Sequence, residues 1–240
     1  MSYIELKGNI FNSKAMAVVN TVNCVGAMGK GIALEYKWRY PEMFQEYQRI
    51  CFAHLLKPGQ ILPYKKSTPI ILNFAIKDDW KNPSRVEWIE ETLQKFVDNY
   101  RLMGITSIAF PWMGAMNGGI PFEIIQSLTR RYLSNLEDIS IEVYAFDPNE
   151  PCSLYKSLEN LVKNNLFTFT ELEDLSQIKA RYWEKIFDAV NDEHTHSLNN
   201  LCNYIVNGKR IIGSTNIERL YLFLTKYTNG NFPIVNSLFD

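Results

Sequence analysis

The sequence lacks several features that would place it in a particular class of protein. No apolar run is long enough to span a bilayer, and the first residues, MSYIELKGNIF, have neither the basic start nor the apolar centre of a secretion signal. The four cysteines, Cys24, Cys51, Cys152 and Cys202, are far apart and form no CxxC pair. This spacing argues against a zinc cluster and against a disulfide framework. We therefore expect a soluble, cytoplasmic protein.

An excess of charge of one sign is also missing. The chain holds 25 Lys and Arg against 26 Asp and Glu, a formal net charge of −1. A protein that grips long duplex DNA through its phosphates would carry a basic excess. Contact with nucleic acid is therefore expected to be local. The hydrophobic fraction of 46% is that of an ordinary globular protein and argues against disorder of the whole chain.

Strand and helix signals alternate over the first 147 residues. The strands are expected over residues 3–7, 15–21, 60–64, 69–76, 105–110 and 139–146. The helices are expected over residues 29–56, 84–103 and 121–136, with a break at Tyr40-Pro41 and a capping box formed by Ser84 and Glu87. Such alternation predicts an α/β fold with a largely parallel or mixed sheet between helices.

The pattern changes after Asp147. Pro148 and Pro151 mark a boundary, and the later segments indicate helices over residues 154–164, 172–190, 197–206 and 216–227. Thr170 and Glu173 form a second candidate capping box. We therefore expect two domains, an α/β domain over residues 1–147 and a small all-α domain over residues 152–240.

The segment NTVNCVGAMGKGIAL, residues 20–34, combines a buried strand, a loop with three glycines and the start of a helix. This arrangement aims backbone N–H groups and the positive end of the helix at an anion such as phosphate. It is not a Walker A loop, because the glycine spacing differs and no Ser or Thr follows Lys30. A tight turn with no ligand remains the alternative for this loop on its own.

A second glycine-rich loop, PWMGAMNGG at residues 111–119, follows another strand and precedes another helix. Loops at the carboxyl ends of sheet strands are where α/β sheets bind ligands. Since two loops can hold two phosphates, the pair favours a diphosphate ligand.

Four segments resemble the macrodomain family in their order and spacing: KGNI at residues 7–10, NTVNCVGAMGKGIAL, NFAIKDDW at residues 73–80 and GAMNGG at residues 114–119. Within that family they most resemble the DarG-type branch, antitoxins that remove ADP-ribose from DNA bases modified by a DarT-type toxin. The resemblance covers about residues 1–147. It implies a macrodomain fold, with a mixed sheet sandwiched between helices, and a hydrolase that needs no metal and no cofactor.

The resemblance also implies the ligand and the residues that bind it. Asn9 falls where the family usually has the Asp that reads the adenine amino group, and an amide can still accept from that group. Asn20 and Asn23 fall around the distal ribose. The implied ADP-ribose-binding residues are Asn9, Ile10, Asn20, Val25, Gly26, Met28, Gly29, Lys30, Gly31, Trp112, Gly114, Ala115, Met116, Asn117, Gly118 and Gly119. A role of Asn9 as a simple turn former remains open.

Lys77 ends an apolar strand and is followed by Asp78, Asp79 and Trp80. Partial burial would lower the pKa of Lys77 and free its amine as a nucleophile or base, while a nearby carboxylate would raise that pKa. On its residues alone a solvated surface lysine is the usual interpretation, because most lysines are exposed. The resemblance implies that Lys77 is the catalytic residue, with Asn23 beside it. The second loop, GAMNGG, offers no carboxylate, which argues against a Lys/Asp pair.

Other candidate residues favour structural roles. His194 and His196 lack the further ligands of a metal site, so a loop at the start of a helix is the better interpretation. Trp80 and Trp112 are expected to anchor the core, with stacking of one of them on a base or ribose as the alternative. Tyr182, Trp183 and Phe187 recur at helical spacing and are expected in the core of the helical domain.

The expected partners are ADP-ribose and an ADP-ribosylated nucleotide in DNA, together with a toxin transferase held by the helical domain, and no membrane. Three alternatives stay open. The chain could be an ADP-ribose reader without turnover, a hydrolase of another ADP-ribose derivative, or an interaction protein in which the helical domain matters most.

Overall fold

The computed structural model describes residues 2–230 and divides into two compact units, with the boundary between Phe146 and Asp147. Within the described residues, no helix is both long enough and apolar enough to cross a membrane.

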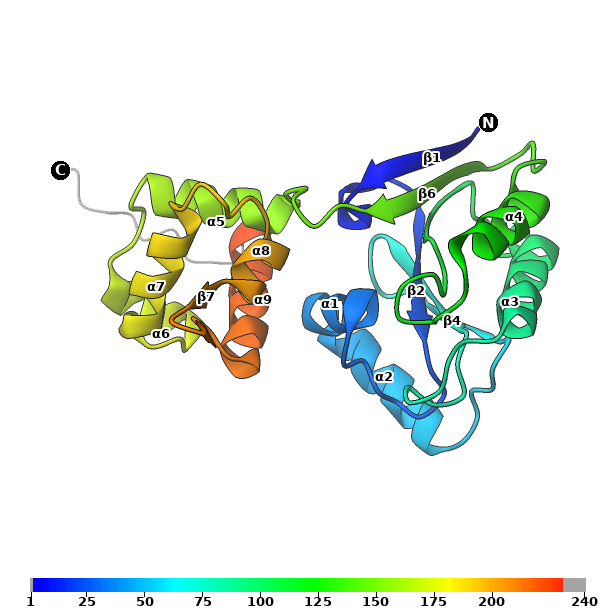
Figure 1. The fold of residues 1–240 in the computed structure, drawn as a ribbon, viewed down its shortest axis with the longest axis horizontal. Helices are drawn as coiled ribbons and strands as arrows, with labels where there is room; N and C mark the ends of the chain where they lie inside the picture. Colours follow the sequence, from blue (N-terminus) through cyan, green and yellow to red (C-terminus); the bar gives the residue numbers. More distant parts are fainter. Residues whose placement is uncertain (1, 231–240) are drawn as a thin grey trace. The chain divides into compact units, whose positions relative to one another are not determined.

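A six-stranded sheet forms the centre of the first unit (Figure 1). In spatial order its strands are β1 (Tyr3–Gly8), β6 (Ser140–Phe146), β5 (Ser107–Pro111), β2 (Ala17–Val22), β4 (Ile70–Ala75) and β3 (Ile61–Tyr64). The first five strands in this order, β1, β6, β5, β2 and β4, pair in parallel with their neighbours. The sixth, β3, lies at the edge and pairs antiparallel with β4. The predicted mixed sheet is therefore confirmed.

Helices cover both faces of this sheet, which explains the nearly continuous apolar strands (Figure 1). On one face, Ala17 and Val19 of β2 join a buried cluster with α3 (Val86–Asn99) and α4 (Phe122–Leu133). On the other face, Val18 and Val22 join a cluster with α1 (Gly31–Arg39) and α2 (Pro41–Phe52). The predicted sandwich of a sheet between helices is confirmed, as is the helix break before Pro41.

The predicted capping box at Ser84 is wrong. α3 begins two residues later, at Val86, and its N-cap residue Arg85 makes no side-chain capping bond. Ser84 is buried, and its backbone N–H donates to the carbonyl oxygen of Gly118 at 2.9 Å. Because Ser84 pairs with a loop far along the chain, it does not cap the helix that follows it.

The second unit is mainly helical. Its elements are α5 (Ser153–Lys163), α6 (Phe169–Ser176), α7 (Ala180–Val190), α8 (Leu198–Asn203), a short hairpin of β7 (Ile205–Val206) and β8 (Lys209–Arg210), and α9 (Ser214–Thr228). Trp183 and Phe187 are buried in its core as predicted, and the indole N–H of Trp183 donates to Ser176 Oγ at 2.9 Å. Tyr182, expected beside them, is only half-buried.

Three local predictions in the second unit are wrong. The helix expected over residues 172–190 is broken at Gln177, which has a left-handed backbone conformation. The capping box uses Thr168 and Glu171. Glu173 instead accepts from Lys179 Nζ and from the N–H of Ala180, and so supports the start of α7. The helix expected over residues 197–206 stops at Asn203, because the following residues form the hairpin around Asn207-Gly208, both with positive φ.

The boundary at Asp147 predicts that the first unit folds alone. A fragment of residues 1–147 contains all six strands of the sheet and both helical layers that cover it. We expect it to be soluble and to unfold in one cooperative thermal transition, followed by circular dichroism. An aggregated fragment, obtained from a full chain that is soluble and stable, would show that the helical unit completes the core.

Candidate active site

Three loops meet at the carboxyl edge of the sheet. They follow β5, β2 and β4, which are neighbours in the sheet and run parallel. Since parallel strands end at the same edge, the two glycine loops and the segment that carries Lys77 lie together. The sequence reasoning placed its main candidate residues in these three loops.

Asn23 shapes the first glycine loop. Its Oδ1 accepts from the N–H groups of Val25 at 3.0 Å and Ala27 at 3.3 Å, and its Nδ2 donates to the carbonyl of Ala27 at 2.6 Å. The Tyr47 hydroxyl of α2 donates to the Asn23 backbone carbonyl at 2.8 Å. The amide of Asn23 thus holds the loop in its bend, and its contact with a ribose stays a prediction.

Two glycines of these loops lie where a side chain would be strained or would clash. A Cβ on Gly31, whose φ is +58°, would lie 2.6 Å from Nδ2 of Asn117. A Cβ on Gly118 would lie 2.3 Å from the carbonyl oxygen of Gly114. At Gly29, by contrast, a Cβ would meet nothing within 4 Å. The first loop therefore packs against the second at Gly31 and has open space at Gly29.

Lys77 connects the third loop to the second. Its Nζ donates to the backbone carbonyl of Asn117 at 2.7 Å, and its side chain is partly exposed. Burial lowers the pKa of Lys77 below the usual value of a lysine, and the nearby charge of Asp78 partly opposes this shift. The backbone N–H of Cys24 donates to the Asp78 carbonyl at 3.1 Å and so connects the third loop to the first. An amine with a lowered pKa therefore lies where the three loops join.

Asn20 is completely buried within the sheet. Its Nδ2 donates to Oδ1 of Asn73 on β4 at 2.8 Å, and Asn73 Nδ2 donates to the Leu62 carbonyl of β3 at 3.2 Å. The sequence reasoning did not select Asn73, although the pairing of two strands that each carry one buried Asn could have indicated it. The predicted contact of Asn20 with the distal ribose remains untested.

Asn9 caps a short 3₁₀ helix, η1 (Ile10–Asn12), by accepting from the N–H of Phe11 at 3.0 Å. This contact fits the turn-forming role that the sequence left open. Asn9 and Ile10 are buried and follow the carboxyl end of β1, so both lie at the same edge of the sheet as the loops. The recognition of adenine by Asn9 stays a prediction.

The remaining predicted ligand residues differ in exposure. Met28 is buried, Val25 and Met116 are exposed, and Lys30 and Gly119 are exposed on their loops. Trp112 is half-buried and packs edge-on against Phe122, with ring centroids 5.2 Å apart, which agrees with a core role. The same expectation is wrong for Trp80, whose side chain is 59% exposed.

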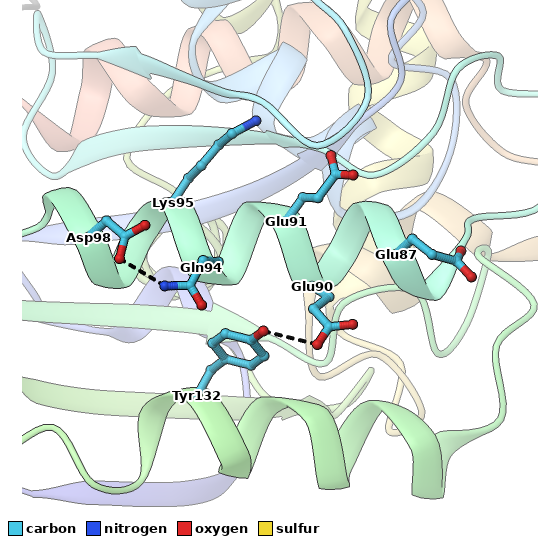
Figure 2. Close-up of a pocket in the computed structure, with 7 residues that line it drawn as sticks. All are labelled: Glu87, Glu90, Glu91, Gln94, Lys95, Asp98 and Tyr132. Carbon is cyan, nitrogen blue, oxygen red and sulfur yellow. Dashed lines mark hydrogen bonds between the residues drawn. The ribbon is translucent and has the colours of Figure 1, made fainter.

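A separate acidic groove runs along α3 (Figure 2). Tyr132 of α4 closes one side of it and donates to Glu90 at 3.0 Å, while Gln94 donates to Asp98 at 2.8 Å. The groove is lined by Glu87, Glu90, Glu91, Gln94, Lys95, Asp98 and Tyr132. Its carboxylates would repel a diphosphate, so this groove does not compete with the loops for such a ligand. Among residues 2–230, no group of three or more His, Cys, Asp or Glu side chains is arranged to hold a metal.

Comparisons with known proteins agree with this arrangement. The Macro domain family model matches residues 19–129. A DNA ADP-ribosyl glycohydrolase of Thermus aquaticus is 37% identical over 150 residues, which cover 60% of this chain and 41% of that protein. The solved macrodomain of Thermus aquaticus DarG matches with a TM-score of 0.57 and 36% identity, over 60% of this chain and 98% of its own. Thermosipho africanus DarTG in complex with ADP-ribose matches with a TM-score of 0.55 and 34% identity, over 58% of this chain and 40% of that one.

A parallel sheet with one antiparallel edge strand, helices on both faces and glycine loops at its carboxyl edge defines a macrodomain-type α/β fold. The chain belongs to the macrodomain family, and its similarity covers nearly the whole length of the DarG macrodomain. Membership of the macrodomain family, which the four sequence segments predicted, is therefore confirmed. The chain spans 41% of the length of the curated Thermus aquaticus relative.

Proposed function

We propose that this chain is an ADP-ribosyl glycohydrolase that removes ADP-ribose from a base in DNA, as the antitoxin to a DNA ADP-ribosyltransferase. The observation that carries the proposal is the Lys77 amine, partly buried and bonded to the second glycine loop. Its relatives support the same activity, since the similar protein of Thermus aquaticus is a DNA ADP-ribosyl glycohydrolase.

ADP-ribose would bind across the two glycine loops. The diphosphate accepts from backbone N–H groups of the loops and from the first turn of α1, whose N-cap residue Lys30 makes no side-chain capping bond. The adenine lies towards Asn9, and the distal ribose lies towards the loop that Asn23 shapes. This orientation brings the anomeric carbon of that ribose near Lys77.

Catalysis would combine positioning with one neutral amine. The Lys77 amine can attack the anomeric carbon: the bond from this carbon to the base breaks, the base leaves with the electron pair and takes up a proton, and water then displaces the lysine. The amine can alternatively accept a proton from a ribose hydroxyl and so assist attack by water. Both steps need the unprotonated form, which partial burial favours.

The substrate class can be tested with two ADP-ribosylated molecules. One is a single-stranded oligonucleotide with ADP-ribose on one base, and the other is a peptide with ADP-ribose on a side chain. We expect the purified chain to release ADP-ribose from the oligonucleotide at least tenfold faster, measured by chromatography of the free sugar nucleotide. Faster release from the peptide would contradict the proposed DNA substrate and indicate that the chain acts on ADP-ribosylated proteins.

The helical unit is proposed to hold the toxin transferase, as the resemblance to DarG-type antitoxins implies. The experiment is co-expression of the full chain with a DarT-type DNA ADP-ribosyltransferase, followed by affinity purification. We expect the two proteins to copurify, and to separate when residues 148–240 are deleted. Failure of the full chain to retain the transferase would contradict this part of the proposal.

The pKa of Lys77 predicts a dependence of the rate on pH. Because the neutral amine reacts, the rate should rise with pH and level off at a pH below about 10.4, the usual pKa of lysine. Asp78→Asn removes a charge that raises the pKa of Lys77, so the rising limb should move to lower pH. Asp98→Asn, a substitution of an exposed residue on α3, is the control and should leave the pH dependence of the rate unchanged. If the rate of Asp78→Asn rises over the same pH range as that of wild type, a group other than Lys77 controls the pH dependence.

A further inference from the structure

Trp80 is the exposed aromatic side chain of a tight turn. The N–H of Asn82 donates to the Asp79 carbonyl at 3.2 Å, so Trp80 and Lys81 are the two central residues of this turn. Trp side chains are on average highly buried, but that of Trp80 is 59% exposed. Its apolar ring is therefore available to a partner.

The two carboxylates beside Lys77 hold this turn in shape. Asp79 Oδ1 accepts from the N–H of Lys81 at 3.0 Å, and the Asp78 carboxylate accepts from the N–H of Asp79 at 2.7 Å. The Asn82 amide also donates to Asp78 Oδ2 at 3.2 Å. A ring presented by a preorganised turn loses little conformational entropy when a flat partner stacks on it.

Positive charge accompanies the exposed ring. Lys81 Nζ lies 5.5 Å from the centroid of the Trp80 ring, and the exposed Arg85 follows in the same loop. An aromatic face next to a cation matches a single nucleic-acid strand, in which bases stack on the ring and phosphates meet the charge. Asp78 and Asp79 balance Lys77 and Lys81 in this segment, so Lys81 offers a single local phosphate contact, which agrees with a chain whose net charge is only −1.

Trp80 is only three residues from Lys77, so their Cα atoms are at most about 11 Å apart. We infer that Trp80 stacks on a base of single-stranded DNA, either the modified base or one close to it in the strand, and that Lys81 meets a neighbouring phosphate.

This inference rests on the proposed function and makes Trp80 a positioning residue of the DNA strand. The carboxylates of Asp78 and Asp79 then support the strand-binding turn, in addition to the electrostatic effect of Asp78 on Lys77. ADP-ribose itself binds elsewhere, on the glycine loops. Changes at Trp80 should therefore affect oligonucleotides and spare free ADP-ribose.

The test compares Trp80→Ala, Trp80→Phe and the full wild-type chain. Leu102→Ala serves as the matched control, because Leu102 is 87% exposed and lies in the loop after α3 that precedes the amino end of β5. Binding of an ADP-ribosylated single-stranded oligonucleotide is measured by fluorescence anisotropy, with Lys77→Ala added to every chain so that the oligonucleotide is not cleaved, and binding of free ADP-ribose is measured by calorimetry. We expect Trp80→Ala to weaken oligonucleotide binding roughly 5- to 150-fold, with Trp80→Phe close to wild type and ADP-ribose affinity unchanged.

Salt dependence tests the role of Lys81. The slope of log Kd against log salt should fall by about 0.7 in Lys81→Gln, as for the loss of one contact to a single-stranded phosphate. Oligonucleotide binding by Trp80→Ala that equals wild type would overturn the inference. The inference would also be overturned if Trp80→Ala lowered turnover of an ADP-ribosylated peptide, which has no neighbouring base, as much as it lowered turnover of the oligonucleotide. If the wild type binds the oligonucleotide through Trp80 but never cleaves it, the proposed function fails while this inference stands.

Discussion

Lys77→Ala is expected to lower the rate of ADP-ribose release from a modified oligonucleotide by about 100-fold or more, because the only proposed amine is lost. Affinity for ADP-ribose should stay within a few-fold of wild type, since the glycine loops supply most of the binding. Lys77→Arg should be equally inactive. Its guanidinium can still donate towards the Asn117 carbonyl, but it remains protonated and cannot act as a nucleophile or base.

The two variants together separate chemistry from structure. If the bond from Lys77 to Asn117 merely stabilised the second loop, Lys77→Arg would keep much of the activity and Lys77→Ala would lose ligand affinity. Lys14→Ala, an exposed change before the amino end of β2, is the control and should retain the wild-type rate. Wild-type turnover by Lys77→Ala would remove Lys77 from the mechanism.

Gly29→Trp is expected to abolish ADP-ribose binding without unfolding the protein. A Cβ at Gly29 meets no atom within 4 Å, so we expect the folded chain to tolerate a side chain there and the bulky indole to block the approach of phosphate to the first loop. In wild type, ligand at about 100 times its Kd should stabilise the fold by about 2.7 kcal/mol and raise Tm by roughly 5–10 °C. In Gly29→Trp this rise should disappear while the melting temperature without ligand stays near that of wild type.

Gly213→Trp is the matched control, because a Cβ at this glycine of the second unit also meets no atom within 4 Å. It should keep the full ligand-induced rise in Tm. Gly118 is a poorer site for the test, since any Cβ there lies 2.3 Å from the Gly114 carbonyl and would disturb the loop itself. An undiminished rise in Gly29→Trp would mean that ADP-ribose does not approach the first loop.

The buried strands and the glycine loops could be predicted because their signals are local. β2 and β4 are short apolar runs, and each glycine loop lies between a strand and a helix. Lys77 could be identified as the end of an apolar strand next to two acids. Its bond to the Asn117 carbonyl could not, because the two residues are 40 positions apart and meet only when β4 and β5 enter the same sheet.

Both capping predictions failed for the same physical reason, which is competition from contacts outside the local segment. Ser84 has the residue pattern of a helix cap, but its N–H is bonded to Gly118. Glu173 fits a capping box with Thr170, but it supports the next helix through Lys179 and Ala180. The core role preferred for Trp80 failed for a different reason: the side chain belongs to the local turn closed between Asp79 and Asn82 and is 59% exposed.

Mass spectrometry of both reaction products tests the central claim most directly. The wild-type chain is incubated with a single-stranded oligonucleotide that carries ADP-ribose on one base, and the oligonucleotide and released sugar nucleotide are measured over time. The proposed activity predicts that the oligonucleotide returns to its unmodified mass while free ADP-ribose appears in equal amount. An oligonucleotide that keeps its ADP-ribose, with a chain that binds free ADP-ribose in the same buffer, would contradict a glycohydrolase and leave an ADP-ribose-binding protein.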